Sequence, residues 1–228
     1  MEYIRTDQAC SFSELLALEQ GIFERIQRGG VGALIFAEVK PTVTLGRRAN
    51  ESQDLLEGKE GLNARGVDVV PVSRGGLATY HGPGQWVLFP CERLELLSGS
   101  VRGVSRLVHS LLGISQEAFK SFGVDAEVRT GCELGLWDRK TGGKLAQVGV
   151  RIDQGIVRHG LSVNIYSTPE SFQGIIPCGL RRAKVTNIAD VLGVRSFAEK
   201  RAIFEHWPMR WIHEAQKCGW LIVAPDVA

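Results

Sequence analysis

The order of elements along this 228-residue chain predicts an α+β fold with a mixed, largely antiparallel sheet and packed helices. An amphipathic helix comes first, short β-branched runs follow, and a long helix separates them from further strand-like runs and a final helix. Because strands and helices are grouped rather than alternating, a regular parallel arrangement is not indicated. We expect the helices on one side of the sheet, and residues 1–228 to form a single domain.

The first half of the chain begins with a capping box, Ser11-Phe-Ser-Glu14. Leu15, Leu18, Ile22 and Ile26 follow at helical spacing, so the sequence predicts an amphipathic helix that ends near Gly29. Short apolar or β-branched runs then predict strands. These runs cover residues 33–39, 42–45, 67–72 and 85–89.

The second half begins with a long core-facing helix, predicted over residues 101–122 by its apolar periodicity and stopped by Gly123. Strand-like runs return at 124–129, 133–137, 145–152 and 156–165. The turn Asp153-Gln-Gly155 joins the last two runs into a predicted hairpin. A second capping box, Ser196-Phe-Ala-Glu199, opens a C-terminal helix that Pro208 should kink or restart.

Composition narrows the class of protein. A net charge of +2 is too small to indicate nucleic-acid binding, and no stretch approaches the ~20 apolar residues that cross a bilayer. The N-terminal residues are charged and lack a signal-peptide apolar region, so we expect a cytoplasmic protein that binds no nucleic acid and no membrane. The five cysteines are widely spaced and form no Cys-x-x-Cys pair, so no metal site is expected.

The run Arg74-Gly-Gly-Leu-Ala-Thr-Tyr-His-Gly-Pro-Gly-Gln85 is the first feature that suggests chemistry. Its glycines and Pro83 cannot continue a helix, and its polar side chains are of the kind that orient substrates. We interpret it as an ordered loop that brings backbone close to a ligand. The alternative is a tight turn between two strands.

Two further segments contain reactive residue types. Cys178 lies between Pro177 and Gly179 after an apolar segment, and a reactive cysteine needs a cationic neighbour. Lys144 stands alone in a small, apolar, strand-like context and is the cation we nominate. The alternatives are a buried structural thiol and a lysine that extends its ammonium to solvent at a strand end.

Other catalytic motifs do not fit. Gly143-Lys144 lacks the spacing of a phosphate-binding loop, and no Gly-x-Gly-x-x-Gly or Gly-x-Ser-x-Gly is present. Nucleotide binding and serine hydrolysis therefore have no motif support, and no cofactor is expected. Among the histidines, His81 and His159 are the better site candidates, because each precedes a glycine in a segment already singled out.

Taken together, these segments resemble the lipoyl(octanoyl) transferases, or octanoyl-[acyl-carrier-protein]–protein N-octanoyltransferases. The resemblance spans about residues 40 to 190, in the order of the family. Its motifs are Arg74 to Gln85, Thr42-Val-Thr-Leu-Gly-Arg-Arg-Ala49, Gly143-Lys144-Leu-Ala-x-x-Gly-Val-Arg151, His159-Gly-Leu-x-x-Asn164, Pro177-Cys178-Gly-Leu and Val185-Thr-Asn187.

The resemblance implies the fold of biotin and lipoate protein ligases, and transfer of octanoyl from octanoyl-acyl carrier protein to a lysine of lipoyl domains. The acceptors would be E2 subunits of 2-oxoacid dehydrogenases and the glycine cleavage H protein, in the first step of endogenous lipoate synthesis. Cys178 would be the acyl-thioester nucleophile and Lys144 its activating partner. The residues implied to bind substrate are Arg74, Gly75, Gly76, Leu77, Ala78, Thr79, Tyr80, His81, Gln147, Val148, Gly149, Gly160, Leu161 and Ser162.

The chain departs from the family at Leu77-Ala78, at Gln147, where the family usually has a small residue, and at Asn187. Gln147 affects the expected pocket depth, so the preferred acyl-chain length stays open.

We expect a backbone N–H of the glycine-rich segment or of Gly179 to hold the oxyanion.

Both protein partners of such enzymes are typically acidic, so Arg47-Arg48 and Arg181-Arg182 are candidate docking clusters. Three alternatives remain open: an ATP-dependent lipoate or octanoate ligase of the same fold, a thioesterase, and a non-catalytic module that binds lipoyl domains.

Overall fold

The computed structural model describes residues 1–181 and 184–223. A seven-stranded sheet has the order β1-β2-β6-β10-β9-β8-β7. In the described ranges β1 and β2 pair in parallel, and the other neighbours in this sheet pair antiparallel, which confirms the predicted mixed, largely antiparallel sheet. The strands are β1 (Glu2–Arg5), β2 (Ala33–Ala37), β6 (Gln85–Cys91), β7 (Ala126–Arg129), β8 (Gly135–Asp138), β9 (Lys144–Asp153) and β10 (Ile156–Asn164).

A second sheet has three strands, with β3 (Thr42–Leu45) between β4 (Asp68–Pro71) and β5 (Ala78–His81). The short helices α2 (Glu51–Asp54) and α3 (Gly58–Ala64) connect β3 to β4. Strand β5 lies inside the segment we interpreted as a loop from Arg74 to Gln85, so that interpretation is wrong for its central residues. Thr, Tyr and His suit a strand, and β5 pairs with β3 over four residues.

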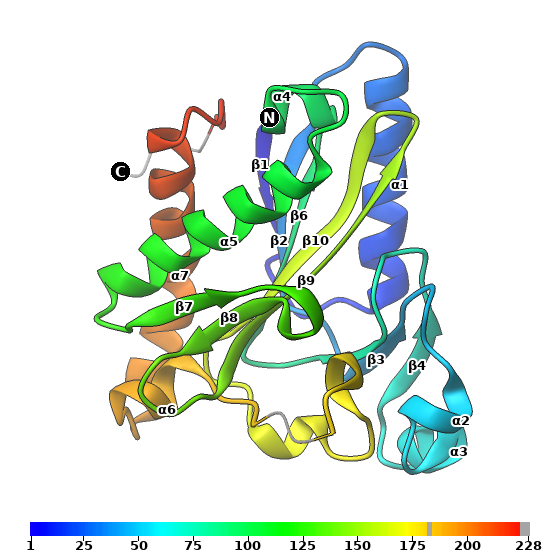
Figure 1. Ribbon diagram of the computed structural model, residues 1–228, viewed down its shortest axis with the longest axis vertical. Helices are drawn as coiled ribbons and strands as arrows, with labels where there is room; N and C mark the ends of the chain where they lie inside the picture. The colour runs from blue at the N-terminus through cyan, green and yellow to red at the C-terminus, as the bar shows by residue number, and fades with distance from the viewer. Residues whose placement is uncertain (182–183, 224–228) are drawn as a thin grey trace.

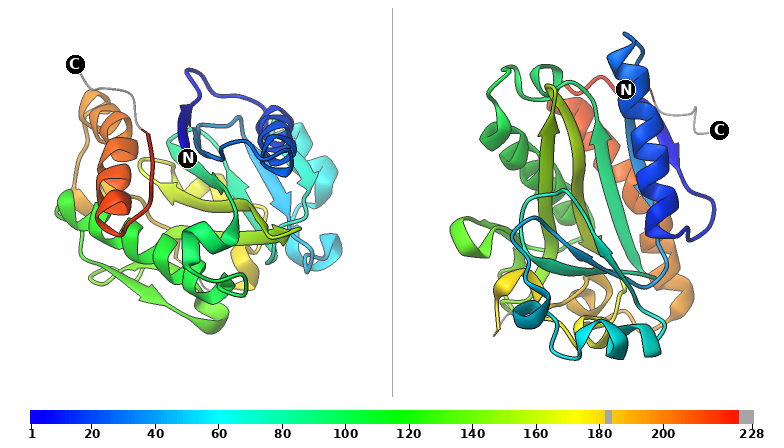
Figure 2. Two further views of the ribbon diagram at one scale, coloured as in Figure 1. Left: turned by 90° about the horizontal axis from the view of Figure 1, so that it is seen from above. Right: turned by 90° about the vertical axis from the view of Figure 1, so that its right-hand side faces the viewer.

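Helices cover both faces of the main sheet, and the expectation of one covered face is wrong (Figures 1 and 2). On β2, Leu34 and Phe36 pack with residues of the long helices α5 (Val104–Ser121) and α7 (Phe197–Lys217). Their neighbours Ala33 and Ile35 pack instead with α1 (Phe12–Gln27). Because successive side chains of a strand point to opposite faces, a strand that is apolar at every position needs cover on both sides.

The predicted helix starts and turns are borne out in part. Ser11 caps α1 through the capping box, with its backbone N–H and hydroxyl bound to the Glu14 carboxylate. The β9–β10 hairpin forms as predicted, with Gln154 and Gly155 both at positive φ. At the start of α7, however, the Ser196 side chain makes no capping hydrogen bond. The remaining short helices are α4 (Leu94–Ser98), α6 (Ile188–Leu192) and the 3₁₀ turns η1 (Gly131–Glu133), η2 (Pro169–Phe172) and η3 (Pro177–Gly179).

Helix α7 does not restart at Pro208 but runs through it from Phe197 to Lys217. A proline in a helix leaves the carbonyl four residues earlier without its usual donor. Here that carbonyl belongs to Phe204, and it accepts a hydrogen bond of 2.7 Å from the indole Nε1–H of Trp86 on β6. A contact from the sheet therefore supplies the donor that the proline lacks.

Over the described residues, none of the helices combines the length and the apolar composition required to cross a membrane.

Candidate active site

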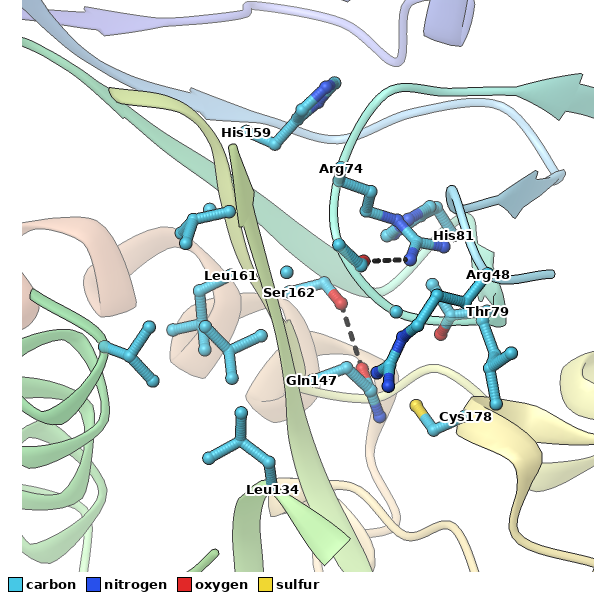
Figure 3. A pocket seen from close by; sticks show the side chains of 18 of the residues that line it. Arg48, Arg74, Thr79, His81, Leu134, Gln147, His159, Leu161, Ser162 and Cys178 are labelled. Atoms are coloured by element: carbon cyan, nitrogen blue, oxygen red, sulfur yellow. Dashed lines mark hydrogen bonds between the residues drawn. The ribbon is translucent and has the colours of Figure 1, made fainter. Parts of the chain in front are cut away.

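A cavity of about 610 Å³ is lined by both sheets together with α1, α5 and the turns η1 and η3 (Figure 3). One part of its wall is polar, with side chains from Arg48, Arg74, Thr79, His81, Gln147 and Ser162. The other part is apolar, with side chains from Phe89, Val108, Leu134, Val148, Val150 and Leu161. A cavity with separate polar and apolar walls suits an acyl group, whose carbonyl is polar and whose chain is not.

Cys178 lies on the cavity wall, on η3, with partial exposure of its side chain. Its backbone is in the left-handed region, with φ 55° and ψ 21°. A residue other than glycine adopts this conformation at a cost, and such strain is concentrated at functional sites. The turn is held by hydrogen bonds from the N–H groups of Gly179 and Leu180 to Ile176 O and Pro177 O.

Arg74 supplies a buried positive charge to the same wall. Its side chain donates to Thr44 O at 2.8 Å, to Thr44 Oγ1 at 2.7 Å and to Gly75 O at 3.0 Å. No carboxylate lies within salt-bridge distance of it in the described ranges. Burial lowers the pKa of the Arg74 guanidinium to about 10, while the electrostatic contribution of Cys178 acts in the opposite direction.

A chain of buried hydrogen bonds runs from Arg74 into the sheets. Thr44 Oγ1, which accepts from Arg74, lies 3.2 Å from His81 Nε2. His81 Nδ1 lies 2.8 Å from Gln85 Oε1, and Gln85 Nε2 donates to Asn164 Oδ1 at 2.9 Å. Because Gln85 Oε1 can only accept, Nδ1 of His81 carries the proton and Nε2 accepts from Thr44. Burial, and then the charge of Arg74, lower the pKa of His81 to about 3, so its ring is neutral.

This series of hydrogen bonds ends at the backbone of Lys144. Asn164 Nδ2 donates to Lys144 O at 3.3 Å and to Thr186 O at 3.0 Å. Thr186 N–H also donates to Lys144 O, and Lys144 N–H donates to Lys184 O. The backbone of Lys144 is therefore tied to the segment that follows the Cys178 turn.

The Lys144 side chain is 1% exposed. Its Nζ donates to Leu134 O at 3.0 Å and lies 5.1 Å from the centroid of the Trp137 ring. Gly135 makes room for it, since a Cβ there would lie 2.8 Å from Lys144 Cε. The β8–β9 register slips at this point, so that Leu145 has no counterpart on β8, and such bulges re-aim side chains.

Several polar atoms of residues that line this cavity are buried and lack a hydrogen-bond partner among the described residues. They are Arg74 Nε, Thr79 Oγ1 and Gln147 Nε2. Buried polar groups are almost always paired, so a group of unpaired atoms around one cavity indicates a polar ligand. In the described part of the chain, no group of three or more His, Cys, Asp or Glu side chains is arranged to hold a metal ion.

Comparison with known proteins places the chain in a family. The model of the lipoyl protein ligase A/B catalytic domain matches residues 11–205. The chain belongs to this family. Octanoyltransferases from Acidobacterium capsulatum and Desulfotalea psychrophila are 33% and 34% identical to it over 186 and 191 residues. These matches cover 78% and 81% of this chain, and 75% and 82% of the relatives.

The fold agrees with this assignment. A Thermoplasma acidophilum protein solved with bound lipoic acid, described as a candidate lipoate protein ligase, superimposes with a TM-score of 0.69 and 14% identity. The match covers 93% of this chain and 86% of that one. The sequence relatives identify the chain as an acyltransferase enzyme of the lipoyl protein ligase family.

All but two of the substrate-binding residues implied by the resemblance to octanoyltransferases lie on the cavity wall. The two are Ala78 and Tyr80, which alternate with Thr79 and His81 on β5 and point to its other face. Tyr80 packs there against Phe172 in the core of the small sheet. Lys144 lies behind the wall and contacts it through the Leu134 carbonyl.

Glycine is needed where the Arg74 segment crosses the hairpin. Gly75 N–H donates to Val150 O, and a Cβ on Gly149 would lie 3.0 Å from Gly75 O and 3.1 Å from Arg74 Cδ. The close approach of the two backbones explains why a small residue stands in β9 at this point.

Several residues of the cavity wall lie outside the set of predicted site residues. Arg48 was assigned only to a surface cluster, yet it lines the cavity and reaches toward Gln147 and Cys178 (Figure 3). It arrives there because the backbone of 46–48 pairs with the segment 74–77. Phe12, Val108 and Leu134 line the cavity from helices and turns far away in sequence. Of the second arginine cluster, Arg181 is exposed and Arg182 lies outside the described residues.

Proposed function

We propose that the protein transfers an octanoyl group from octanoyl-acyl carrier protein to a specific lysine of lipoyl domains, through a thioester on Cys178. One observation carries the proposal: Cys178 lies in a strained turn beside a cavity with an apolar part, the buried Arg74 lies on the same wall without a carboxylate partner in the described ranges, and Lys144 is buried behind that wall, bound to the Leu134 carbonyl. Such cations favour an anion, and the thiolate is the anion that acyl transfer requires.

In the first half-reaction, the Cys178 thiolate attacks the carbonyl carbon of the donor thioester. The new S–C bond forms, the carbonyl electron pair moves to oxygen, and collapse of this intermediate breaks the bond to the pantetheine sulfur. Lys144 gives the departing thiolate a proton and becomes a neutral amine. Exchange of one thioester for another is close to balanced, so alignment of the two sulfurs is the main requirement.

In the second half-reaction, the neutral amine of the acceptor lysine attacks the acyl-Cys178 carbonyl. The C–N bond forms, the C–S bond breaks, and Cys178 leaves as thiolate. The acceptor nitrogen gives up a proton to Lys144, which restores the starting ammonium. An acyl chain against Leu134, whose carbonyl binds Lys144, keeps water away while the amine is neutral.

The partners we propose are octanoyl-acyl carrier protein as donor and lipoyl domains, of E2 subunits and of glycine cleavage H protein, as acceptors. The similarity to octanoyltransferases and the family description support this choice. We further propose that residues 1–228 act as one catalytic domain, because the cavity is lined from Phe12 to Leu180.

Intact-protein mass tests the proposal. The protein is incubated with octanoyl-acyl carrier protein without ATP, and we expect a gain of one octanoyl group. The adduct should disappear in Cys178→Ala and persist in Cys218→Ala, which removes an exposed thiol beyond α7. Loss of the adduct in Cys132→Ala instead would assign the acyl group to the other cysteine of the cavity wall.

The family description also covers ligases, so an ATP-dependent ligase is the second candidate function. If wild type gains no mass from the carrier, addition of ATP and free octanoate separates the two. Modification of a lipoyl domain only in the presence of ATP, and unaffected by Cys178→Ala, would favour the ligase. Release of free octanoate without an acceptor would favour a thioesterase.

A further inference from the structure

Gln147 presents a buried, unused hydrogen-bond donor to the cavity. Its side chain extends from β9 and the residue is 5% exposed. Its Oε1 accepts a hydrogen bond of 2.9 Å from the hydroxyl of Ser162, the residue opposite it on β10. Its Nε2 has no partner among the described residues. The Ser162 contact therefore fixes the amide with its NH₂ group free.

A buried donor without an acceptor destabilises the folded protein, so a protein keeps one where a ligand supplies the acceptor. The NH₂ end of Gln147 and the sulfur of Cys178 point toward one another, and Arg48 lies beside them (Figure 3). The ligand atom that belongs between these groups is the carbonyl oxygen of an acyl group joined to that sulfur.

Several neighbouring donors are already committed, although Arg74 Nε is not. Gly179 N–H, which we considered for this role from the sequence, donates to Ile176 O at 3.2 Å. Leu180 N–H donates to Pro177 O at 3.0 Å. The terminal nitrogens of Arg74 are bound to Thr44 and to Gly75 O. The amide of Gln147 needs no rearrangement to become a donor, which is the property that lowers a barrier most.

We propose that Gln147 is a catalytic residue of this acyltransferase, whose Nε2–H donates to the carbonyl oxygen of the acyl group. The inference rests on the proposed function of Cys178. In each half-reaction the electron pair that moves from the C=O bond to oxygen is stabilised by this donor, and returns when the C–S bond breaks. Gln147 transfers no proton and forms no covalent bond.

Two variants remove the donor in different ways. Gln147→Met keeps the volume of the side chain, and Gln147→Ala shortens it, so a folding defect in one leaves the other as the test. We expect acylation of Cys178 by octanoyl-acyl carrier protein to slow by about 100-fold, in kcat rather than KM, as with other single oxyanion donors. Thr6→Val is the matched control, because it removes an unpartnered buried oxygen of a residue outside the cavity wall.

A spectroscopic readout separates catalysis from packing. Infrared difference spectra of the enzyme acylated with [1-¹³C]octanoyl report the thioester C=O stretch, which a hydrogen bond lowers. We expect a lower frequency in wild type than in Gln147→Met, and an intermediate value in Ser162→Ala, where the amide is less firmly held.

The outcomes are distinct from those of the proposed function. If wild type forms no Cys178 adduct, the function itself fails and this inference falls with it. If wild type is acylated but both Gln147 variants react within threefold of it, with an unchanged C=O frequency, the inference is wrong. A variant that reacts normally with octanoyl and faster with longer chains would make Gln147 a residue that limits pocket depth.

Discussion

At the scale of single residues, His81 and His159 show how the cavity is built from polar groups that stay neutral. His81 is 5% exposed and bound through both ring nitrogens, while His159 is 2% exposed and bound through Nε2 to Ser73 at 3.1 Å. Burial, and then the charges of nearby arginines, lower both pKa values from 6.5 to about 3. Because both rings are neutral, the histidines add no positive charge to a cavity wall that already carries Arg48 and Arg74.

These histidines predict a loss of stability in mild acid. Above pH 6.5 the ring is neutral in both the folded and the unfolded chain, so the full stability is present. Below 6.5 the unfolded chain binds a proton that the folded chain excludes until about pH 3. Each histidine therefore lowers the free energy of unfolding by about 2 kcal/mol between pH 6.5 and 5.

Urea unfolding at pH 7, 6 and 5 measures this slope. His81→Gln keeps a donor for Gln85 and an acceptor for Thr44 but cannot titrate, so we expect it to reduce the loss by about 2 kcal/mol over that range. An equal loss in His81→Gln and in wild type would show that His81 does not resist protonation.

At the scale of elements, α7 depends on the sheet it packs against. Pro208 provides no N–H for Phe204 O, and Trp86 Nε1 supplies the donor from β6. The Trp86 ring also stacks on Phe204, with ring centroids 4.1 Å apart. The strand and the helix thus share one buried hydrogen bond and one aromatic contact.

Removal of the Trp86 donor should lower the free energy of unfolding, and replacement of Pro208 should restore part of the lost stability. We expect Trp86→Phe to lower the free energy of unfolding by about 1–3 kcal/mol, because Phe204 O is left buried without a donor. Pro208→Ala restores the backbone N–H, so its addition to Trp86→Phe should recover part of the loss. Urea unfolding followed by circular dichroism measures all four proteins of this cycle, and additive effects would contradict the coupling.

The same elements mark where sequence patterns succeed and where they stop. The periodicity of α1 and α5 and the Gly155 turn are local properties, and they predicted those elements correctly. The continuity of α7 depends on Trp86, which is 118 residues from Phe204 in the sequence. Strand β5 depends on pairing with β3. Contacts of this kind are fixed by tertiary packing and leave no local pattern.

At the scale of the whole molecule, the cavity is where the two sheets meet. Residues of the glycine-rich segment and of β9–β10 are expected there from their motifs, because close backbone approach requires glycine at set positions. Val108 and Leu134 are not marked by any motif, since their place depends on how α5 and η1 fold around the sheets. Arg48 belongs to the Thr42–Ala49 motif, but its place in the cavity depends on pairing of the 46–48 segment with 74–77. The motifs identify most of the polar wall, and the apolar wall adds residues such as Val108 that only packing brings to the cavity.

The neighbouring residues Arg47 and Arg48 differ in their position relative to the cavity. Arg47 and Arg48 are both exposed residues, but Arg48 lines the cavity and Arg47 does not. We expect Arg47→Ser to act only on the encounter with an acidic carrier protein. Its KM for octanoyl-acyl carrier protein should rise about two- to fivefold at low salt and return to the wild-type value near 0.5 M salt, because screening removes interactions between exposed charges.

Steady-state kinetics at several salt concentrations measures this effect. Arg102→Ser removes an exposed arginine just ahead of α5, outside the cavity wall, and matches the change in net charge. If Arg102→Ser raises KM as much as Arg47→Ser does, the effect belongs to the net charge of the molecule. An effect confined to Arg47 would show that the carrier protein docks on the surface around Arg47 and Arg48. The carrier would then deliver its thioester to the part of the cavity where Cys178 lies.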